Sequence, residues 1–189
     1  MIDKKLLEKI DKDLLLYQKE RGFINRISSD ILSKSKTAIF LVHEGKIKEA
    51  EIKLAEAKKQ LIELNKKYNK SSRLESEGSY KASVEEFLEA QFFFFAVQDK
   101  KITIDKDLKF GPEEYIGGLC DLGGELVRQC ILKAHLRDIE LIKKYREIAK
   151  EIVGFMLKFY MTGKLRSKFD DAKRNLQRIE TIIYELGLK

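Results

Sequence analysis

Two pairs of acidic residues have the spacing at which neighbouring side chains of a helix share one face. Glu86 and Glu89 stand three residues apart, and Asp121 and Glu125 stand four apart. Like charges at such spacings mildly destabilise a helix, so these pairs suggest a site rather than an ordinary surface. Carboxylate oxygens are the ligands that Mg²⁺ and Mn²⁺ prefer. If the two segments pack side by side, the four carboxylates predict a site for one of these cations.

Glycine is concentrated around the second pair. Each glycine costs about 1 kcal/mol relative to alanine inside a helix. At about 100° per residue, three of the four glycines share the face of Asp121, whereas Leu122 and Leu126 lie opposite. The acidic face therefore has little bulk, and another backbone can approach it closely. A helix packed tightly through glycine, with its acids at a solvated edge, is the alternative, and spacing alone does not separate the two. The four glycines are Gly117, Gly118, Gly123 and Gly124.

The first pair lies in a segment that is apolar on nearly every side, VEEFLEAQFFFFAV. Glu86 shares its face with Ala90 and Phe93, where an unpaired carboxylate is unfavourable because burying a charge costs several kcal/mol. Two interpretations remain open. Either Glu86 and Glu89 form salt bridges with lysine or arginine from elsewhere, or they bind a cation.

Several other chemistries are excluded by their missing motifs. The sequence has no GxxxxGK[ST] loop, no GxGxxG, and no HExxH or zinc-type cysteine spacing. His43 and His135 are the only histidines, and neither stands three residues after a glutamate, as a di-iron helical bundle would require. We expect His43 to serve packing or capping at a helix end. Cys120 and Cys130 are expected to be small core residues rather than nucleophiles.

Helical periodicity accounts for most of the chain. We expect a loop at 69–79 and a break between helices near His135–Asp138. We also expect a charged connection at 100–110, with a brief extended piece at Ile102–Ile104. Proline at the first turn and glutamates beside it favour a helix start at Gly111–Glu114. The predicted helices are 2–42, 47–68, 80–98, 111–134, 139–160 and 164–186.

Composition indicates a single all-α domain over residues 1–189. Charged residues make up 37% and apolar residues 43% of the 189, with one proline and no tryptophan. A net charge of +7 favours a polyanionic partner such as nucleic acid. Two cysteines without CxxC spacing fit a reducing cytoplasm. The longest apolar run, Phe92–Val97, is too short to span a bilayer, and acids stand near the N-terminus where a signal peptide has its apolar core.

Four segments resemble the translin superfamily, and most closely its catalytic branch, translin-associated protein X and its archaeal relatives. Ser33–His43 reads SKSKTAIFLVH and resembles the family's SK-x-x-IF-x-LH. Glu86–Ala90 reads EFLEA and resembles E-aromatic-x-E-A. Tyr115–Arg128 reads YIGGLCDLGGELVR and resembles Y-L-x-G-x-x-DL-x-GEL-x-R, the most specific of the four. Arg166–Leu186 resembles the closing helix, with K-aromatic-D-x-x-K and x-IE-x-x-x-Y-x-L.

The resemblance implies six to seven helices in a translin-like bundle, and protomers that assemble into a barrel-shaped homo-oligomer, hexamer to octamer. It also implies a Mg²⁺- or Mn²⁺-dependent endoribonuclease acting on single-stranded RNA, with Glu86, Glu89, Asp121 and Glu125 as catalytic acids and metal ligands. The branch that binds nucleic acid without cutting it lacks the aspartate of DL-x-GEL, which is present here as Asp121.

The sequence also departs from the family pattern. Glu44 stands where relatives often have arginine, which puts one basic RNA contact in doubt, and the chain ends at Lys189 with little tail. Neither departure touches the four acids.

Two further interpretations compete with the nuclease. The first is a binding oligomer that holds single-stranded RNA or DNA without chemistry. The second is a structural oligomer whose acids only pair with lysines. Candidate RNA contacts equally fit a solvated helix face; they are Arg128, Arg166, Lys168, Lys173 and Arg174. A helix as apolar as the one at Glu85–Val97 is buried either by its own fold or by another subunit, and a symmetric homo-oligomer is the expected solution.

Overall fold

The structure is a computed structural model that describes residues 2–68 and 72–187. Residues 69–71 of the predicted loop and the C-terminal Lys189 lie outside the described residues. Six helices and no strand are found in the described part of the chain, which confirms the all-α prediction. The helices are α1 (Lys4–His43), α2 (Ile47–Tyr68), α3 (Gly78–Val97), α4 (Pro112–Ala134), α5 (Ile139–Met156) and α6 (Gly163–Gly187).

Local sequence signals set several of the helix ends. The Asp3 carboxylate accepts a hydrogen bond from the backbone N–H of Lys5 at 3.0 Å and caps α1. Gly45 follows α1 with a φ of +75°, a left-handed conformation that glycine adopts without strain and that ends the helix. Pro112 opens α4, where its missing N–H has no helical partner to lose. The start of α4 agrees with the prediction, and α1 begins and ends within two residues of its predicted bounds.

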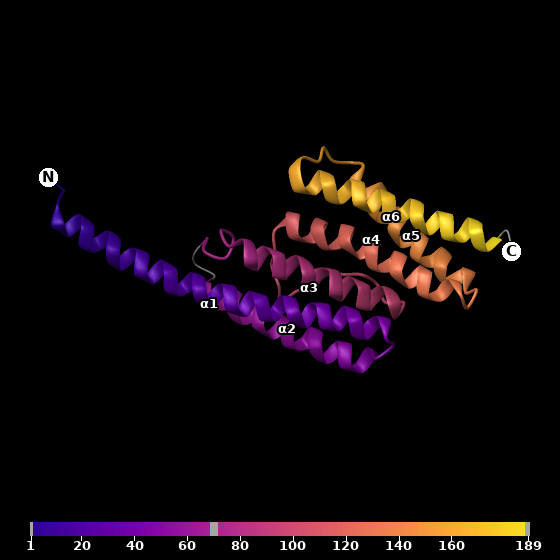
Figure 1. The fold of residues 1–189 in the computed structure, drawn as a ribbon, viewed down its shortest axis with the longest axis horizontal. Coiled ribbons are helices and arrows are strands. Elements are labelled where there is room, and N and C mark those ends of the chain that lie inside the picture. Colours follow the sequence, from indigo (N-terminus) through magenta and orange to yellow (C-terminus); the bar gives the residue numbers. More distant parts are fainter. Residues whose placement is uncertain (1, 69–71, 188–189) are drawn as a thin grey trace.

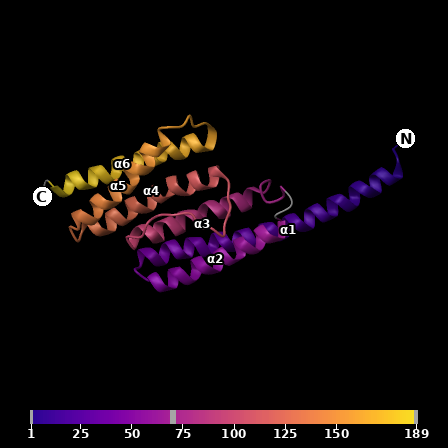
Figure 2. The same ribbon diagram turned by 180° about the vertical axis from the view of Figure 1, so that it is seen from behind.

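The helices stack in layers, with α3 in the middle (Figure 1). Helices α1 and α2 lie on one side of α3, and α4 lies on the other side with α5 and α6 beyond it. The same order is visible from behind (Figure 2). This arrangement places α3 directly against α4, so the segments that carry the two acidic pairs are neighbours.

Helix α3 is covered within a single chain. Phe87, Phe92 and Phe93 are all buried, and no large apolar side chain of α3 is exposed. Of the two alternatives for its burial, the chain's own fold is the one observed, so this helix does not require a second subunit. Helices α1, α2 and α4 enclose it instead, because α3 lies in the middle layer.

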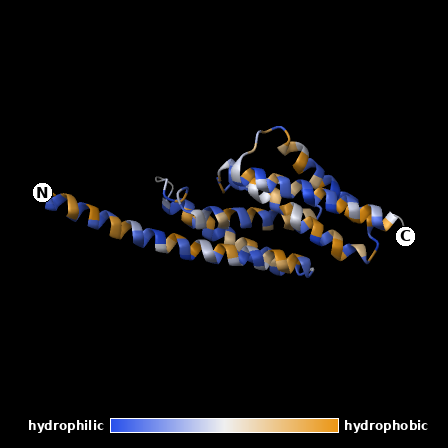
Figure 3. Ribbon diagram, turned by 45° about the horizontal axis from the view of Figure 1, so that its top comes forward, coloured by the Kyte–Doolittle hydropathy of each residue, from blue (hydrophilic) through white to orange (hydrophobic). Residues whose placement is uncertain are grey.

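The N-terminal half of α1 extends beyond the bundle as an arm, which we define as residues 2–19 (Figure 1). Every residue of the arm is exposed, and apolar positions coloured orange run along it (Figure 3). Apolar residues recur every seven positions along the whole helix. Ile24, Ile31 and Ala38 of this series are 0% exposed, whereas Ile10 and Tyr17 are 51% and 43% exposed. The apolar stripe that α1 buries in the bundle thus continues outward without cover.

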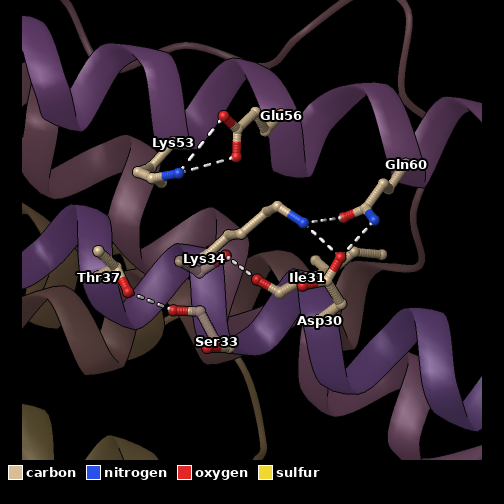
Figure 4. Close-up of polar contacts among 9 residues, drawn as sticks. Asp30, Ile31, Ser33, Lys34, Thr37, Lys53, Glu56 and Gln60 are labelled. Carbon is tan, nitrogen blue, oxygen red and sulfur yellow. Dashed lines mark hydrogen bonds and ion pairs between the residues drawn. The ribbon is translucent and has the colours of Figure 1, made fainter.

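Polar contacts fasten α1 to α2 at the edge of the bundle (Figure 4). The amide of Gln60 on α2 donates to Asp30 of α1 at 2.6 Å and accepts from Lys34 of α1 at 3.3 Å. Lys34 also pairs with Asp30 one turn before it. These contacts fix the neighbouring helix against the part of α1 that enters the core.

Several boundaries differ from the predictions, and helix α1 begins at Lys4 rather than at residue 2. Helix α3 begins at Gly78, two residues earlier than expected, and 102–104 form neither helix nor strand. Helix α5 ends at Met156 rather than near Tyr160. After the buried Met156, the backbone N–H groups of Lys158 and Phe159 donate to carbonyl oxygens three residues back at 3.2 Å, so the chain tightens into a turn toward α6.

No helix among the described residues is long and apolar enough to cross a membrane.

Candidate acidic site between α3 and α4

Two glycines of α4 allow the close approach of α3. A Cβ added at Gly118 would stand 2.7 Å from Leu88 Cβ and 3.1 Å from the backbone nitrogen of Glu89. A Cβ at Gly117 would stand 2.4 Å from a carboxylate oxygen of Glu85. Both distances to side-chain atoms are shorter than real Cβ contacts, so a larger residue at 118 would push α3 away, and one at 117 would displace the Glu85 side chain. This confirms that the acidic face of α4 is the face that another backbone approaches.

Glu89 lies among the other predicted acids and has the most strongly perturbed carboxyl group in the cluster. Burial, and after it the negative charges of Asp121, Glu86 and Glu125, raise the pKa of Glu89 to about 9. Lys168 opposes this effect only weakly. The three neighbouring carboxylates act on Glu89 because α3 and α4 bring the two pairs together. The Glu89 carboxyl is therefore mostly protonated at neutral pH.

Asp121 of α4 is paired with a lysine of α6. The ammonium of Lys168 donates to Asp121 Oδ2 and also lies 2.7 Å from Glu85 Oε1. Burial, reinforced by the charge of Glu85, still raises the pKa of Asp121 above its ordinary value, although Lys168 counteracts it. Burial disfavours the charge on Lys168, but its hydrogen bonds to the two carboxylates outweigh burial and raise its pKa.

Glu125 of α4 is held by the C-terminal residue of α1. His43 Nε2 bonds to Glu125 Oε2, and its Nδ1 lies 3.0 Å from the amide nitrogen of Gln129. The His43 side chain is only 3% exposed, and its ring lies 4.7 Å from that of Phe93. Because the Gln129 amide donates to Nδ1, the Nε2–H of His43 is the group that donates to Glu125. The packing role expected for His43 is present, but its bond to a predicted site acid is a new finding.

Glu86 is the fourth acid, and its nearest cation is distant. Lys36 Nζ of α1 stands 4.0 Å from Glu86 Oε2, and the Lys36 side chain is 61% exposed. Burial raises the pKa of Glu86; Lys36 lowers it, and Asp121 and Glu125 raise it further. An exposed pair at this distance contributes little to stability.

The four predicted acids therefore lie close enough to perturb one another, and three of them also have a basic partner. In the part of the chain that the structure describes, no three His, Cys, Asp or Glu side chains are already arranged to hold a metal ion. The donor set is nevertheless all carboxylate, which suits Mg²⁺ or Mn²⁺. The proton on Glu89 and the ammonium of Lys168 now reduce the negative charge of the acid cluster. A bound divalent cation can neutralise this charge in their place.

The predicted RNA contacts divide into two groups. Lys168 and Arg128 lie at the acids, since Arg128 Nη1 is 3.8 Å from Glu125 Oε2 and its side chain is 52% exposed. The others pair with acids of α6 itself, and these pairs are exposed or partly exposed. Arg166 and Lys173 pair with Asp170, and Arg174 pairs with Asp171.

Sequence reasoning missed two residues of the site and the ion pairs of a third, Lys168, whose predicted contact with RNA stays a prediction. Glu85 binds Lys168, His43 binds Glu125, and Lys168 pairs with both Glu85 and Asp121. The only sequence signal for Glu85 is its position one residue before the predicted pair. The two thiols behave as expected: Cys120 and Cys130 are free and buried, and burial raises their pKa values to about 11 and about 12.

A separate cavity of about 820 Å³ lies between α2, the start of α3 and the segment leading into α4. It contains Tyr80, whose hydroxyl donates to Asn65 Oδ1 at 2.6 Å. None of the four acids lines this cavity.

Comparison with known proteins points to one family. The model of the Translin family matches residues 19–189. An uncharacterized protein of Methanocaldococcus jannaschii is 28% identical over 89% of this chain and 79% of its own length. Translin-associated protein X of Pongo abelii is 22% identical over 87% of this chain and 71% of its own length.

Solved structures share the fold. The crystal structure of AfC3PO has a TM-score of 0.84 and 23% identity, and the match covers 96% of this chain and 97% of that one. A structure of AfC3PO with duplex RNA matches with the same TM-score and identity, over 96% of each chain. The crystal structure of apo-NeC3PO has a TM-score of 0.82 and 19% identity, over 98% of each chain.

Proposed function

The chain belongs to the translin family, and from this premise we propose that it is a metal-dependent endoribonuclease that cleaves single-stranded RNA. The observation that carries the proposal is the raised pKa of Glu89. Burial, and after it the charges of Asp121, Glu86 and Glu125, raises its pKa to about 9, so α3 and α4 bring all four carboxylates close enough to interact. Such crowding is unfavourable for a purely structural core and typical of a functional site.

Glu86, Glu89, Asp121 and Glu125 would hold Mg²⁺ or Mn²⁺. When bound, such a cation polarises a phosphodiester and lowers the pKa of its water, which supplies the nucleophile for hydrolysis. The chain's own groups orient the ligands: His43 fixes Glu125 from the side of α1. Arg128 offers a cation to an RNA phosphate at the edge of the acids, where its side chain is 52% exposed.

Cleavage of a labelled, unstructured RNA tests this proposal. We expect cleavage in Mg²⁺ or Mn²⁺, none in EDTA, and a loss of at least a hundredfold in rate for Asp121→Ala and Glu125→Ala. Glu113→Ala is the matched control, because Glu113 is an exposed acid of the same helix. Duplex RNA belongs in the same assay, since the complex of the relative AfC3PO contains it. Intact RNA under every metal condition would refute the nuclease.

A non-catalytic oligomer that binds single-stranded RNA or DNA is the second candidate. The observation that favours it is the neutralisation of the acids by the chain's own residues, above all Asp121 by Lys168. For this candidate we expect an affinity for nucleic acid that falls as salt rises, as phosphate contacts require. The affinity should change neither with added metal nor with the substitutions of the acids. Binding of this kind without cleavage would select this candidate.

We also propose that the protein forms a homo-oligomer, from hexamer to octamer and barrel-shaped, through the arm. Leu7, Ile10 and Leu14 are each about half exposed along the arm, and packing this apolar stripe against other copies would remove it from water. Ile10→Gln with Leu14→Gln should lower the mass measured by sedimentation. Lys12→Gln, on the same arm, should leave the measured mass unchanged.

Two free cysteines suit a cytoplasmic location.

A further inference from the structure

Lys168 is a lysine of α6 whose ammonium is enclosed by two acids from different helices. Its side chain is 14% exposed, and its Nζ contacts Asp121 of α4 and Glu85 of α3. Only Asp121 of these two acids belongs to the predicted metal site. The ammonium thus joins a site acid to an acid outside the site.

The position of Glu85 is built into the packing of the helices. Gly117 leaves the space that the Glu85 carboxylate occupies, since a Cβ there would stand 2.4 Å from its oxygen. Lys164 approaches the same carboxylate at 3.0 Å. Glu85 is therefore a fixed anion beside the site, and it can keep Lys168 paired without the help of Asp121.

We propose that Lys168 is a positioning residue that occupies Asp121 until a divalent cation binds there, and that Glu85 then retains its ammonium. This inference depends on the proposed function, because it assumes that the cation binds at Asp121. When the cation replaces Lys168 as the partner of Asp121, no buried charge is left unpaired. The Asp121 carboxylate would then bind the cation, and the ammonium of Lys168 would remain paired with Glu85. It also accounts for an acid cluster that is not arranged as a metal site while Lys168 is bonded to Asp121.

Two substitutions should then shift cation affinity in opposite directions. Lys168→Met removes the competing ammonium, so Mn²⁺ should bind roughly tenfold more tightly, the factor expected for losing one hydrogen bond between charged groups. Glu85→Gln removes the alternative partner, so Lys168 holds Asp121 more strongly and Mn²⁺ should bind several-fold more weakly. A purely structural role for Lys168 predicts lower stability in both variants and no opposed change in affinity.

The experiment is titration calorimetry of the full chain with Mn²⁺, at one pH and one protein concentration. Lys164→Met is the matched control, because Lys164 contacts Glu85 but not Asp121 and is 68% exposed. We expect its affinity to stay within about twofold of the wild type. Thermal unfolding of each variant without metal verifies that it folds. If Lys168→Met does not fold, Glu85→Gln decides alone: weaker binding supports the inference, and unchanged or tighter binding overturns it.

The failures of the two proposals are distinguishable. Wild-type protein that binds no Mn²⁺ overturns the proposed metal site and this inference together. A second outcome is that the wild type binds Mn²⁺, Asp121→Asn abolishes this binding, and Lys168→Met and Glu85→Gln bind Mn²⁺ with wild-type affinity. This outcome supports the metal site and overturns only the role of Lys168 and Glu85.

Discussion

Substitution of Glu89 by glutamine should change how the stability of the protein depends on pH. In the folded chain the pKa of Glu89 is raised from 4.5 to about 9, chiefly by burial. Between these values folding takes up a proton, so the free energy of unfolding falls as pH rises, by about 1.4 kcal/mol per pH unit. From pH 5 to pH 8 the wild type should lose up to about 4 kcal/mol through this one group. Glu89→Gln has no such proton to take up.

The assay is urea denaturation followed by circular dichroism, in EDTA and at one protein concentration. The free energy of unfolding of Glu89→Gln should approach that of the wild type near pH 5 and exceed it by up to about 4 kcal/mol at pH 8. Glu63→Gln, at an exposed glutamate of α2, is the matched control and should follow the wild type at every pH. Parallel curves for Glu89→Gln and the wild type would refute the argument that three acids crowd Glu89.

Two further substitutions test the packing around the site. Gly118→Ala places a Cβ 2.7 Å from Leu88 Cβ, so it should destabilise the protein by about 1–3 kcal/mol in urea denaturation. The control Gly22→Ala, with nothing within 4 Å of its added Cβ, should stabilise the protein by about 0.5–1 kcal/mol. Equal effects of the two substitutions would argue against the close approach of α3 and α4. His43→Ala removes the donor to Glu125 and should cost about 1–3 kcal/mol in the same measurement. An unchanged midpoint would show that this hydrogen bond does not stabilise the fold.

The helices and the two acidic pairs were predictable because they depend on local spacing, whereas the packing of one pair against the other was only a condition of the predicted cation site. Glycine at 117 and 118 signalled a close approach, and α3 is the helix that makes it. The partners of the acids were not predictable. His43 lies 82 residues from Glu125, and Lys168 lies 47 residues from Asp121, so only the fold brings them together. No local pattern distinguishes such a residue from others of its type.

Sequence reasoning also could not decide how the most apolar helix is buried. Hydropathy identifies α3 as the most apolar helix, but it does not show that α1, α2 and α4 enclose it. The arm is less conspicuous because charged residues separate its leucines. Its apolar stripe has the same seven-residue period as the buried part of α1, and only the end of the bundle near residue 20 divides them. Which part of a periodic stripe is buried depends on tertiary structure.

The most direct test of the central claim is a crystal structure of the protein grown with Mn²⁺, with anomalous scattering measured at the manganese edge. The account predicts a peak bounded by the carboxylates of Glu86, Glu89, Asp121 and Glu125, with the ammonium of Lys168 on Glu85 alone. A structure in which Lys168 still binds Asp121 and no peak lies among the four acids would contradict it.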